Sequence, residues 1–127
     1  MTRYEKALAN GVDGFARLLA EQKIVSMADA CKGIGIDMDN FTMSMENFQH
    51  EVDAYRSNLT LEDCPFMELL DSYGVHGIDF FASLLALERF NNMNIIFMEC
   101  IGKEAEKSDE LMDDLANRFY YFLMEEV

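Results

Sequence analysis

The segment from residue 78 to residue 101 constrains the fold more than any other part of the chain. It contains no glycine or proline, and apolar side chains recur on nearly every side of the helix that it would form. Asp79, Glu88, Arg89, Glu99 and three asparagines interrupt it, so it falls short of the roughly 20 apolar residues that a membrane-spanning helix needs. A helix that is apolar on nearly all sides must be enclosed by other elements. The sequence therefore predicts a central helix over 78–101.

The segments on either side also carry helical patterns. The chain of 127 residues contains one proline and seven glycines, so few positions interrupt a helix. Apolar residues recur before and after the central segment at the period of an amphipathic helix, about 3.6 residues. We predict an all-α single domain of five or six helices, with residues 1–58 as a three-helix part and 60–127 as a second helical part.

Residues that start and stop helices place the boundaries. Short polar residues cap helix starts, and glycine commonly follows a helix end. The predicted helices are 3–22, weakened at Gly11 and Gly14; 26–33, capped at Ser26 and ended by Gly33; one from Asp37 or Asp39 to about Arg56; one after Asp63 that ends at Gly74; the central 78–101; and a last helix capped by Ser108.

The chain is strongly acidic. Its 24 Asp and Glu residues outnumber 10 Lys and Arg residues, which gives a formal net charge of −14. Such a field repels phosphate groups, so general binding to nucleic acid or to an anionic membrane is not expected. The three cysteines form no CxxC pair, and the N-terminus lacks the apolar core of a signal peptide. We therefore predict a cytoplasmic protein without a metal or cofactor.

The sequence contains no pattern typical of an enzyme. Glu46, His50 and Asp53 would share one helix face, as metal ligands do in some helical bundles. The chain has no second helix with a matching Glu and His pair, however, and it lacks the glycine-rich loops that bind phosphate groups. The sequence predicts an exposed polar face at these three residues and a protein without catalytic activity.

A motif over residues 18–45 combines a capped helix start, a small apolar pair, a glycine turn and an aromatic residue. The residues that carry it are Ser26, Ala30, Cys31, Gly35, Ile36 and Phe41. Their spacing resembles the helix-turn-helix of transposase and phage-terminase proteins, and this resemblance implies a three-helix part of that type. In DNA-binding helix-turn-helix proteins, the helix after the turn enters the major groove, where Lys and Arg make many of the contacts. This chain has neither residue between Lys32 and Arg56.

The helix after this motif is instead rich in acids. Its apolar stripe, predicted to face the core, consists of Phe41, Met45, Phe48, Val52 and Tyr55. The residues between these positions would then face outward together. The predicted partner-binding residues are Asp37, Asp39, Met43, Glu46, Glu51 and Asp53, and the acidic segment 104–114 is the next candidate.

These residues predict a non-enzymatic binding protein that docks on a basic protein surface, one that normally holds nucleic acid. In type it is similar to small acidic inhibitors and DNA mimics of phages and mobile elements, such as anti-CRISPR proteins, and a nuclease would be a suitable partner. Three alternatives stay open. The acids could form only a solubilising surface, the chain could form a homodimer, or a regulatory or virion-related helix-turn-helix protein could contact DNA through its N-terminal third.

Overall fold

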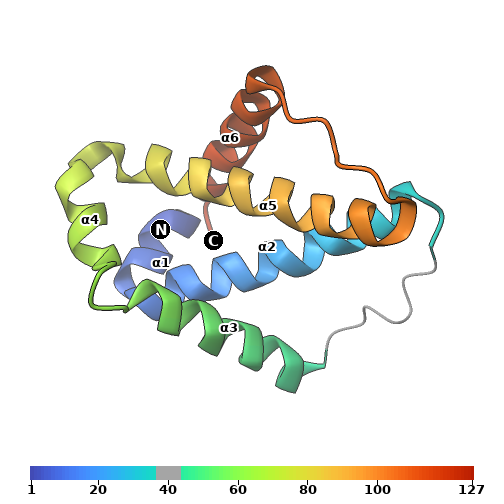
Figure 1. The fold of residues 1–127 in the computed structure, drawn as a ribbon. Coiled ribbons are helices and arrows are strands. Elements are labelled where there is room, and N and C mark those ends of the chain that lie inside the picture. Colours follow the sequence, from blue (N-terminus) through green and yellow to red (C-terminus); the bar gives the residue numbers. More distant parts are fainter. Residues whose placement is uncertain (37–43) are drawn as a thin grey trace.

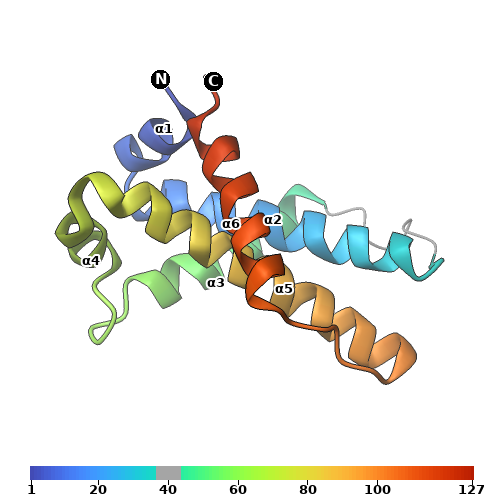
Figure 2. The same cartoon turned by 90° about the horizontal axis from the view of Figure 1, so that it is seen from above.

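Helix α5 (Gly77–Ile101) packs against α2, α4 and α6, which confirms the predicted central helix. The computed structural model describes residues 1–36 and 44–127. Helix α2 (Val12–Gly33) packs along one side of α5, and α6 (Asp109–Met124) crosses another side (Figures 1 and 2). The buried positions of α5 include Phe81, Leu85 and Ile96. They recur at helical spacing and face these neighbours.

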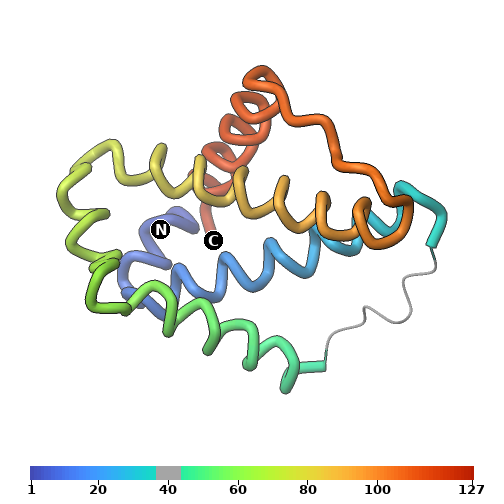
Figure 3. Tube along the Cα trace, viewed as in Figure 1, coloured from blue at the N-terminus to red at the C-terminus, as the bar shows by residue number. Residues whose placement is uncertain are grey.

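The remaining elements are shorter. Helix α1 (Arg3–Ala9) precedes α2, α3 (Met45–Leu59) packs on α2, and α4 (Phe66–Tyr73) leads through the 3₁₀ turn η2 (Gly74–His76) into α5. The two termini lie side by side (Figure 3), and Thr2 and Glu126 form an isolated β-bridge there. The described residues thus form six α-helices, which confirms the all-α prediction. None of these helices is long and apolar enough to cross a membrane.

Aromatic side chains from several helices form the centre of the core. Phe15 of α2 is fully buried, and its ring centroid lies 4.7 Å from that of Phe81 in α5 and 5.3 Å from that of Phe66 in α4. Tyr4 of α1 lies 5.8 Å from Phe15, and Phe119 of α6 belongs to the same cluster. Helices from both predicted parts therefore share one core, and the chain is a single domain.

The helix boundaries near the N-terminus agree with the prediction only in part, because the first helix does split at one of its two weakening glycines but no new helix starts at Ser26. The chain breaks at Gly11, whose φ of 65° favours glycine, and α2 then continues without interruption to Gly33. The separate short helix predicted from Ser26 is wrong, because the Ser26 hydroxyl donates to the carbonyl oxygen of Gln22 at 2.7 Å inside α2. Residues 18–33 of the helix-turn-helix motif therefore lie in one continuous helix, although its predicted end at Gly33 is confirmed.

Helix α3 begins later than predicted. Its N-cap is Ser44, whose side chain accepts a hydrogen bond from the backbone N–H of Asn47 at 3.2 Å. The prediction that Asp37 or Asp39 caps this helix is therefore wrong, and both aspartates lie outside the described residues. By contrast, the predicted end of α4 at Gly74 and the predicted cap of α6 at Ser108 are confirmed.

The predicted buried stripe of α3 is confirmed at Phe48, Val52 and Tyr55 but is wrong at Met45. Met45 is 80% exposed, because it lies in the first turn and the packed side chains of α3 begin at Phe48. Val52 is fully buried, and Leu59, one turn beyond the predicted end, is 8% exposed. Phe41 lies outside the described residues. The core contact of α3 therefore comes from its middle and its C-terminal end.

Asp13 of α2 pairs with Arg56 of α3 and with Arg17 of its own helix, and this network predicts a pH-dependent contribution to stability. Its carboxylate accepts hydrogen bonds from Arg56 and from Arg17, and these bonds, the one from Arg56 foremost, hold its pKa below the usual range. A carboxyl whose pKa is lower in the folded than in the unfolded chain stabilises the fold above the unfolded pKa, and this contribution is lost as the pH falls through the folded pKa. We expect Asp13→Asn to lower the free energy of unfolding by about 1 kcal/mol at neutral pH.

Urea unfolding at neutral and at acidic pH measures this contribution. The difference between the parent and Asp13→Asn should shrink as the pH falls below about 4. Asp63→Asn is the control, because Asp63 is exposed and has no ion pair among the described residues; its effect should stay within about 0.5 kcal/mol. A difference that is constant across this pH range would contradict the assignment.

Candidate functional site

Half of the predicted partner-binding residues can be placed in the structure. Asp37, Asp39 and Met43 lie outside the described residues. Glu46 lies in the first turn of α3 and is exposed, as predicted for an outward-facing carboxylate. It has no ion pair within residues 1–36 and 44–127.

The other two α3 carboxylates are paired with cations of the same chain. Glu51 accepts a hydrogen bond from the Nζ of Lys23 at 2.9 Å, and its side chain is only 30% exposed. Asp53 accepts a hydrogen bond from Arg56 at 2.8 Å and one from Gln49 at 3.0 Å. A paired carboxylate offers less to a partner than an unpaired one. Among the predicted partner-binding residues in the described part of α3, Glu46 is thus the carboxylate most available to a partner.

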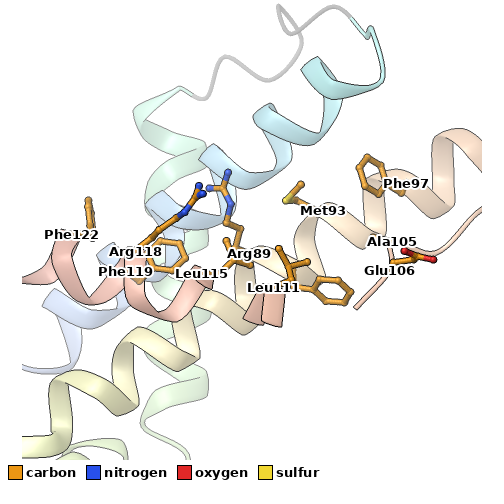
Figure 4. A pocket seen from close by; sticks show the side chains of 11 residues that line it. Arg89, Met93, Phe97, Ala105, Glu106, Leu111, Leu115, Arg118, Phe119 and Phe122 are labelled. Carbon is orange, nitrogen blue, oxygen red and sulfur yellow. The ribbon is translucent and has the colours of Figure 1, made fainter. Parts of the chain in front are cut away.

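A pocket of about 580 Å³ lies between α5, α6 and the connection over residues 102–108 (Figure 4). Gly102, with a φ of 66°, ends α5 and turns the chain back. The connection then returns beside α5 before α6 begins (Figure 2). The backbone N–H of Ala105 donates to the Oδ1 of Asn94 at 2.8 Å, which holds the connection against α5. Because α6 crosses α5 instead of running along it, the space between them stays open.

The walls of this pocket are largely apolar. Figure 4 shows side chains of both helices pointing into the space between them. Leu111, in the first turn of α6, is 39% exposed, so the pocket is accessible from solvent. A concave apolar surface of this size is typical of sites that take up a ligand or an anchoring side chain. The apolar lining residues are Phe90, Met93, Phe97, Ala105, Leu111, Leu115, Phe119 and Phe122.

Two arginines line the pocket, and each is paired with a carboxylate. Arg89 donates to Asp29 of α2 at 2.6 Å, and the Nε of Arg118 lies 3.1 Å from Asp114. Lys107 lies over the ring of Phe90, with its Nζ 5.8 Å from the ring centroid. These cations therefore have partners within the chain.

Exposed carboxylates gather in the segment of chain beside the pocket, which also contains Lys103 and Lys107. They come from the 102–108 connection and the first two turns of α6, and Glu106 is the one acid among them that lines the pocket. We call them the acidic rim: Glu104, Glu106, Asp109, Glu110 and Asp113. None of the five has an ion pair among the residues that the structure describes. The site thus combines an apolar floor with an acidic segment of chain beside it.

The sequence indicated the acidic segment 104–114 but not the pocket beside it. The available signal was the spacing of Phe90 and Phe97, two turns apart, together with Leu111 and Leu115, one turn apart. Apolar residues at these spacings also occur in cores without a pocket, so the spacing alone does not predict one. The pocket exists only because of the angle at which α6 crosses α5.

The residues considered as metal ligands do not come together as a site. Glu46, His50 and Asp53 are exposed on α3. Within the described part of the chain, no group of three or more His, Cys, Asp or Glu side chains could hold a metal ion. Comparisons with protein-family models, with characterised proteins and with solved structures find no match to this chain. Its function must therefore be inferred from its own residues.

Proposed function

We propose that this chain is a non-enzymatic binding protein that docks on a basic protein surface. The observation that carries this proposal is the apolar pocket between α5 and α6 with its acidic rim. A partner segment with an apolar anchor and neighbouring Lys or Arg side chains would fill the pocket and pair with the rim. Desolvated apolar anchors supply most of the affinity in such interfaces, whereas rim charges mainly raise the association rate.

The distribution of the cations supports a negative docking surface. Most of the 10 Lys and Arg side chains are bound to acids of the same chain, so a large excess of carboxylates remains at the surface. The cations in these ion pairs are Arg3, Arg17, Lys23, Arg56, Arg89 and Arg118. Carboxylates spaced along a rigid helix are able to imitate phosphates. A nuclease or another nucleic-acid-binding effector is therefore a suitable class of partner, as for anti-CRISPR-type inhibitors.

The same ion pairs weigh against the alternative of DNA binding through the N-terminal third. Three of the five cations in residues 1–33, namely Arg3, Arg17 and Lys23, are paired with a carboxylate, whereas Lys6 and Lys32 are exposed and have no ion pair among the described residues. Contacts to DNA through the three paired cations would have to break these pairs, and the excess acids would repel the phosphates. Binding of a DNA duplex at low salt would support the alternative and contradict docking on a basic protein.

Two synthetic helical peptides test the proposed chemistry directly. Both carry leucines on one face; one carries lysines on the other face, and its matched control carries glutamates. We expect the lysine peptide to bind in a fluorescence anisotropy assay, with an affinity that falls as salt is added. The glutamate peptide should not bind at the same concentrations. Equal binding of the two peptides would show that the carboxylates play no part.

Charge reversal in the acidic rim should weaken binding of the lysine peptide by about tenfold to hundredfold at low salt, since each exposed pair contributes about 0.5–1 kcal/mol. The variant is Glu104→Lys, Glu106→Lys and Asp113→Lys, which spares Asp109 and Glu110 because acids in a first turn stabilise their helix. Circular dichroism checks that the fold is retained.

Two matched triple variants separate position from net charge. Glu62→Lys, Asp63→Lys and Asp71→Lys changes the net charge equally in and around α4, at the other end of α5 (Figure 1), and should have a much smaller effect. Asp37→Lys, Asp39→Lys and Glu46→Lys tests the surface predicted from the sequence. If only this last variant weakens binding, the acidic docking face is on and before α3 and not at the pocket. Equal losses in all three would mean that net charge alone determines binding.

A further inference from the structure

The buried core of the described chain consists of two separate apolar clusters. The main cluster includes Phe15 of α2 and Phe81 of α5 and involves all six helices. The second cluster lies toward the C-terminal ends of α2 and α5. Its buried members are Ala30, Cys31 and Ile96, and Met27, Ile34, Met93 and Phe97 pack against them. We call the segments 27–33 and 93–101 the distal unit.

Buried polar side chains separate the two clusters along both helices. In the part of the chain that the structure describes, three polar residues are buried, and we call them the polar layer: Gln22, Ser26 and Asn92. Gln22 and Ser26 follow the main-cluster residues of α2 and precede Ala30, and Asn92 follows those of α5 and precedes Ile96. The apolar contacts of the distal unit are therefore not continuous with those of the main cluster.

The polar layer is incompletely hydrogen-bonded. The Ser26 hydroxyl donates to the carbonyl oxygen of Gln22 at 2.7 Å. The Nε2 of Gln22 and the Nδ2 of Asn92 have no hydrogen-bond partner among the described residues, although both side chains are more than nine-tenths buried. Asn92 adjoins the hydroxyl of Tyr55, which donates to Glu88 at 2.8 Å. Because a buried donor without an acceptor costs free energy, the layer holds α2 and α5 together weakly.

The distal unit is also open on its outer side. Figure 2 shows the C-terminal ends of α2 and α5 diverging from each other. On α5, Ile95, Met98 and Ile101 are 46%, 44% and 52% exposed. A region with few buried apolar contacts opens at a lower free energy than the core of the same domain. The two helix ends pack on each other through the second cluster, so loss of that contact should release both together.

We propose that the distal unit opens as one step while the main cluster stays folded, and that this opening removes one wall of the docking pocket. Met93 and Phe97 line the pocket and also pack on the second cluster. The wall that they form is thus complete only while the distal unit is closed. The opening itself does not rest on the proposed docking function, whereas its effect on docking does.

Amide hydrogen exchange, followed residue by residue by NMR on the full chain, tests the opening. We expect the amides of 28–31 and 94–98 to share one protection factor, at least about tenfold below that of the amides of 16–22 and 82–88. The change should occur as a step at the polar layer. Fraying of the helix ends would instead give a gradual decline along each helix. Such a decline, or equal protection on both sides of the layer, would overturn the proposal.

Asn92→Leu tests the role of the polar layer, because it replaces an unpartnered amide by an apolar side chain that joins the two clusters. The protection of the distal amides should rise by about tenfold relative to that of the main cluster. Asn91→Leu is the matched control, since it makes the same change at an exposed position of α5; its gain in helix propensity should raise protection by less than about threefold. Equal effects of the two variants would contradict the assignment.

Gln22→Leu makes the corresponding change from α2 and keeps the test available if Asn92→Leu does not fold. It removes the other unpartnered amide of the layer and should also raise the protection of the distal amides relative to that of the main cluster. If the protection of the distal unit is unchanged in this variant, the polar layer is not what separates the two clusters.

The lysine peptide tests the link between the opening and docking. At a free concentration of about ten times its dissociation constant, it should raise the protection of the distal amides about tenfold, because only the closed unit offers the complete pocket. The glutamate peptide is the control and should leave the protection unchanged. If the lysine peptide binds without this effect, the pocket does not depend on the distal unit. If it does not bind, the docking proposal fails, whereas a step in hydrogen exchange still supports the opening.

Discussion

Gly14→Ala is expected to destabilise the domain by about 3 kcal/mol. A Cβ atom on Gly14 would contact the carbonyl oxygen of Ala7 and lie 2.8 Å from its Cα. Both atoms belong to the backbone of α1, so no side-chain rotation relieves the clash. Helix α1 would have to move away from α2, and Tyr4 would lose its contact with Phe15, at a centroid distance of 5.8 Å.

Urea unfolding measures this effect, and Gly33→Ala is the matched control. Gly33 is the last residue of α2, and a Cβ there would meet no atom within 4 Å. Alanine at this helical position should be neutral or should stabilise the domain by up to about 1 kcal/mol. If the two variants shift the unfolding midpoint alike, the close approach of α1 to α2 is not what requires Gly14.

Phe15→Ala is expected to have a comparable or larger effect, about 3–5 kcal/mol. Phe15 is fully buried, and its ring lies among those of Tyr4, Phe66 and Phe81. Removing it opens a cavity among helices α1, α2, α4 and α5, which cannot all close on the gap at once. Tyr121→Ala is the control, since Tyr121 is 71% exposed, and its effect should be below about 0.5 kcal/mol.

A milder pair of variants keeps this test measurable if Phe15→Ala does not fold. Phe15→Leu and Phe81→Leu each remove one ring of a pair whose centroids lie 4.7 Å apart. The double variant should cost less than the sum of the two single variants, by about 0.5–1.5 kcal/mol, because the edge-to-face contact can be lost only once. Additive costs would show that the two rings do not interact.

The helices themselves were largely predictable, because the signals that begin and end them are local. Ser108 caps α6 through a hydrogen bond to a backbone N–H three residues away, and Gly74 ends α4 with a φ of 58°. Ser26 shows the limit of such signals. Its hydroxyl is able either to cap a new helix or to bond to the carbonyl oxygen of Gln22, and the structure has the second arrangement.

The predicted contact residues were harder to assess from sequence, because their availability depends on residues far along the chain. Glu51 is separated by 28 positions from Lys23, its partner. The two meet because α2 and α3 pack antiparallel, as the contact between Asp13 and Arg56 also shows. Helix α3, which is acidic in sequence, therefore takes part in ion pairs with α2 through Glu51 and Arg56.

The sequence by itself determined that this chain is all-α, that residues 78–101 form its central helix and that its surface is acidic. These properties follow from composition and from hydrogen bonds between residues close in the chain. Tertiary structure alone decided which carboxylates are paired and that a pocket opens beside residues 104–113. Those features depend on the angles and offsets at which helices pack, and many side-chain contacts distant in sequence set these angles together.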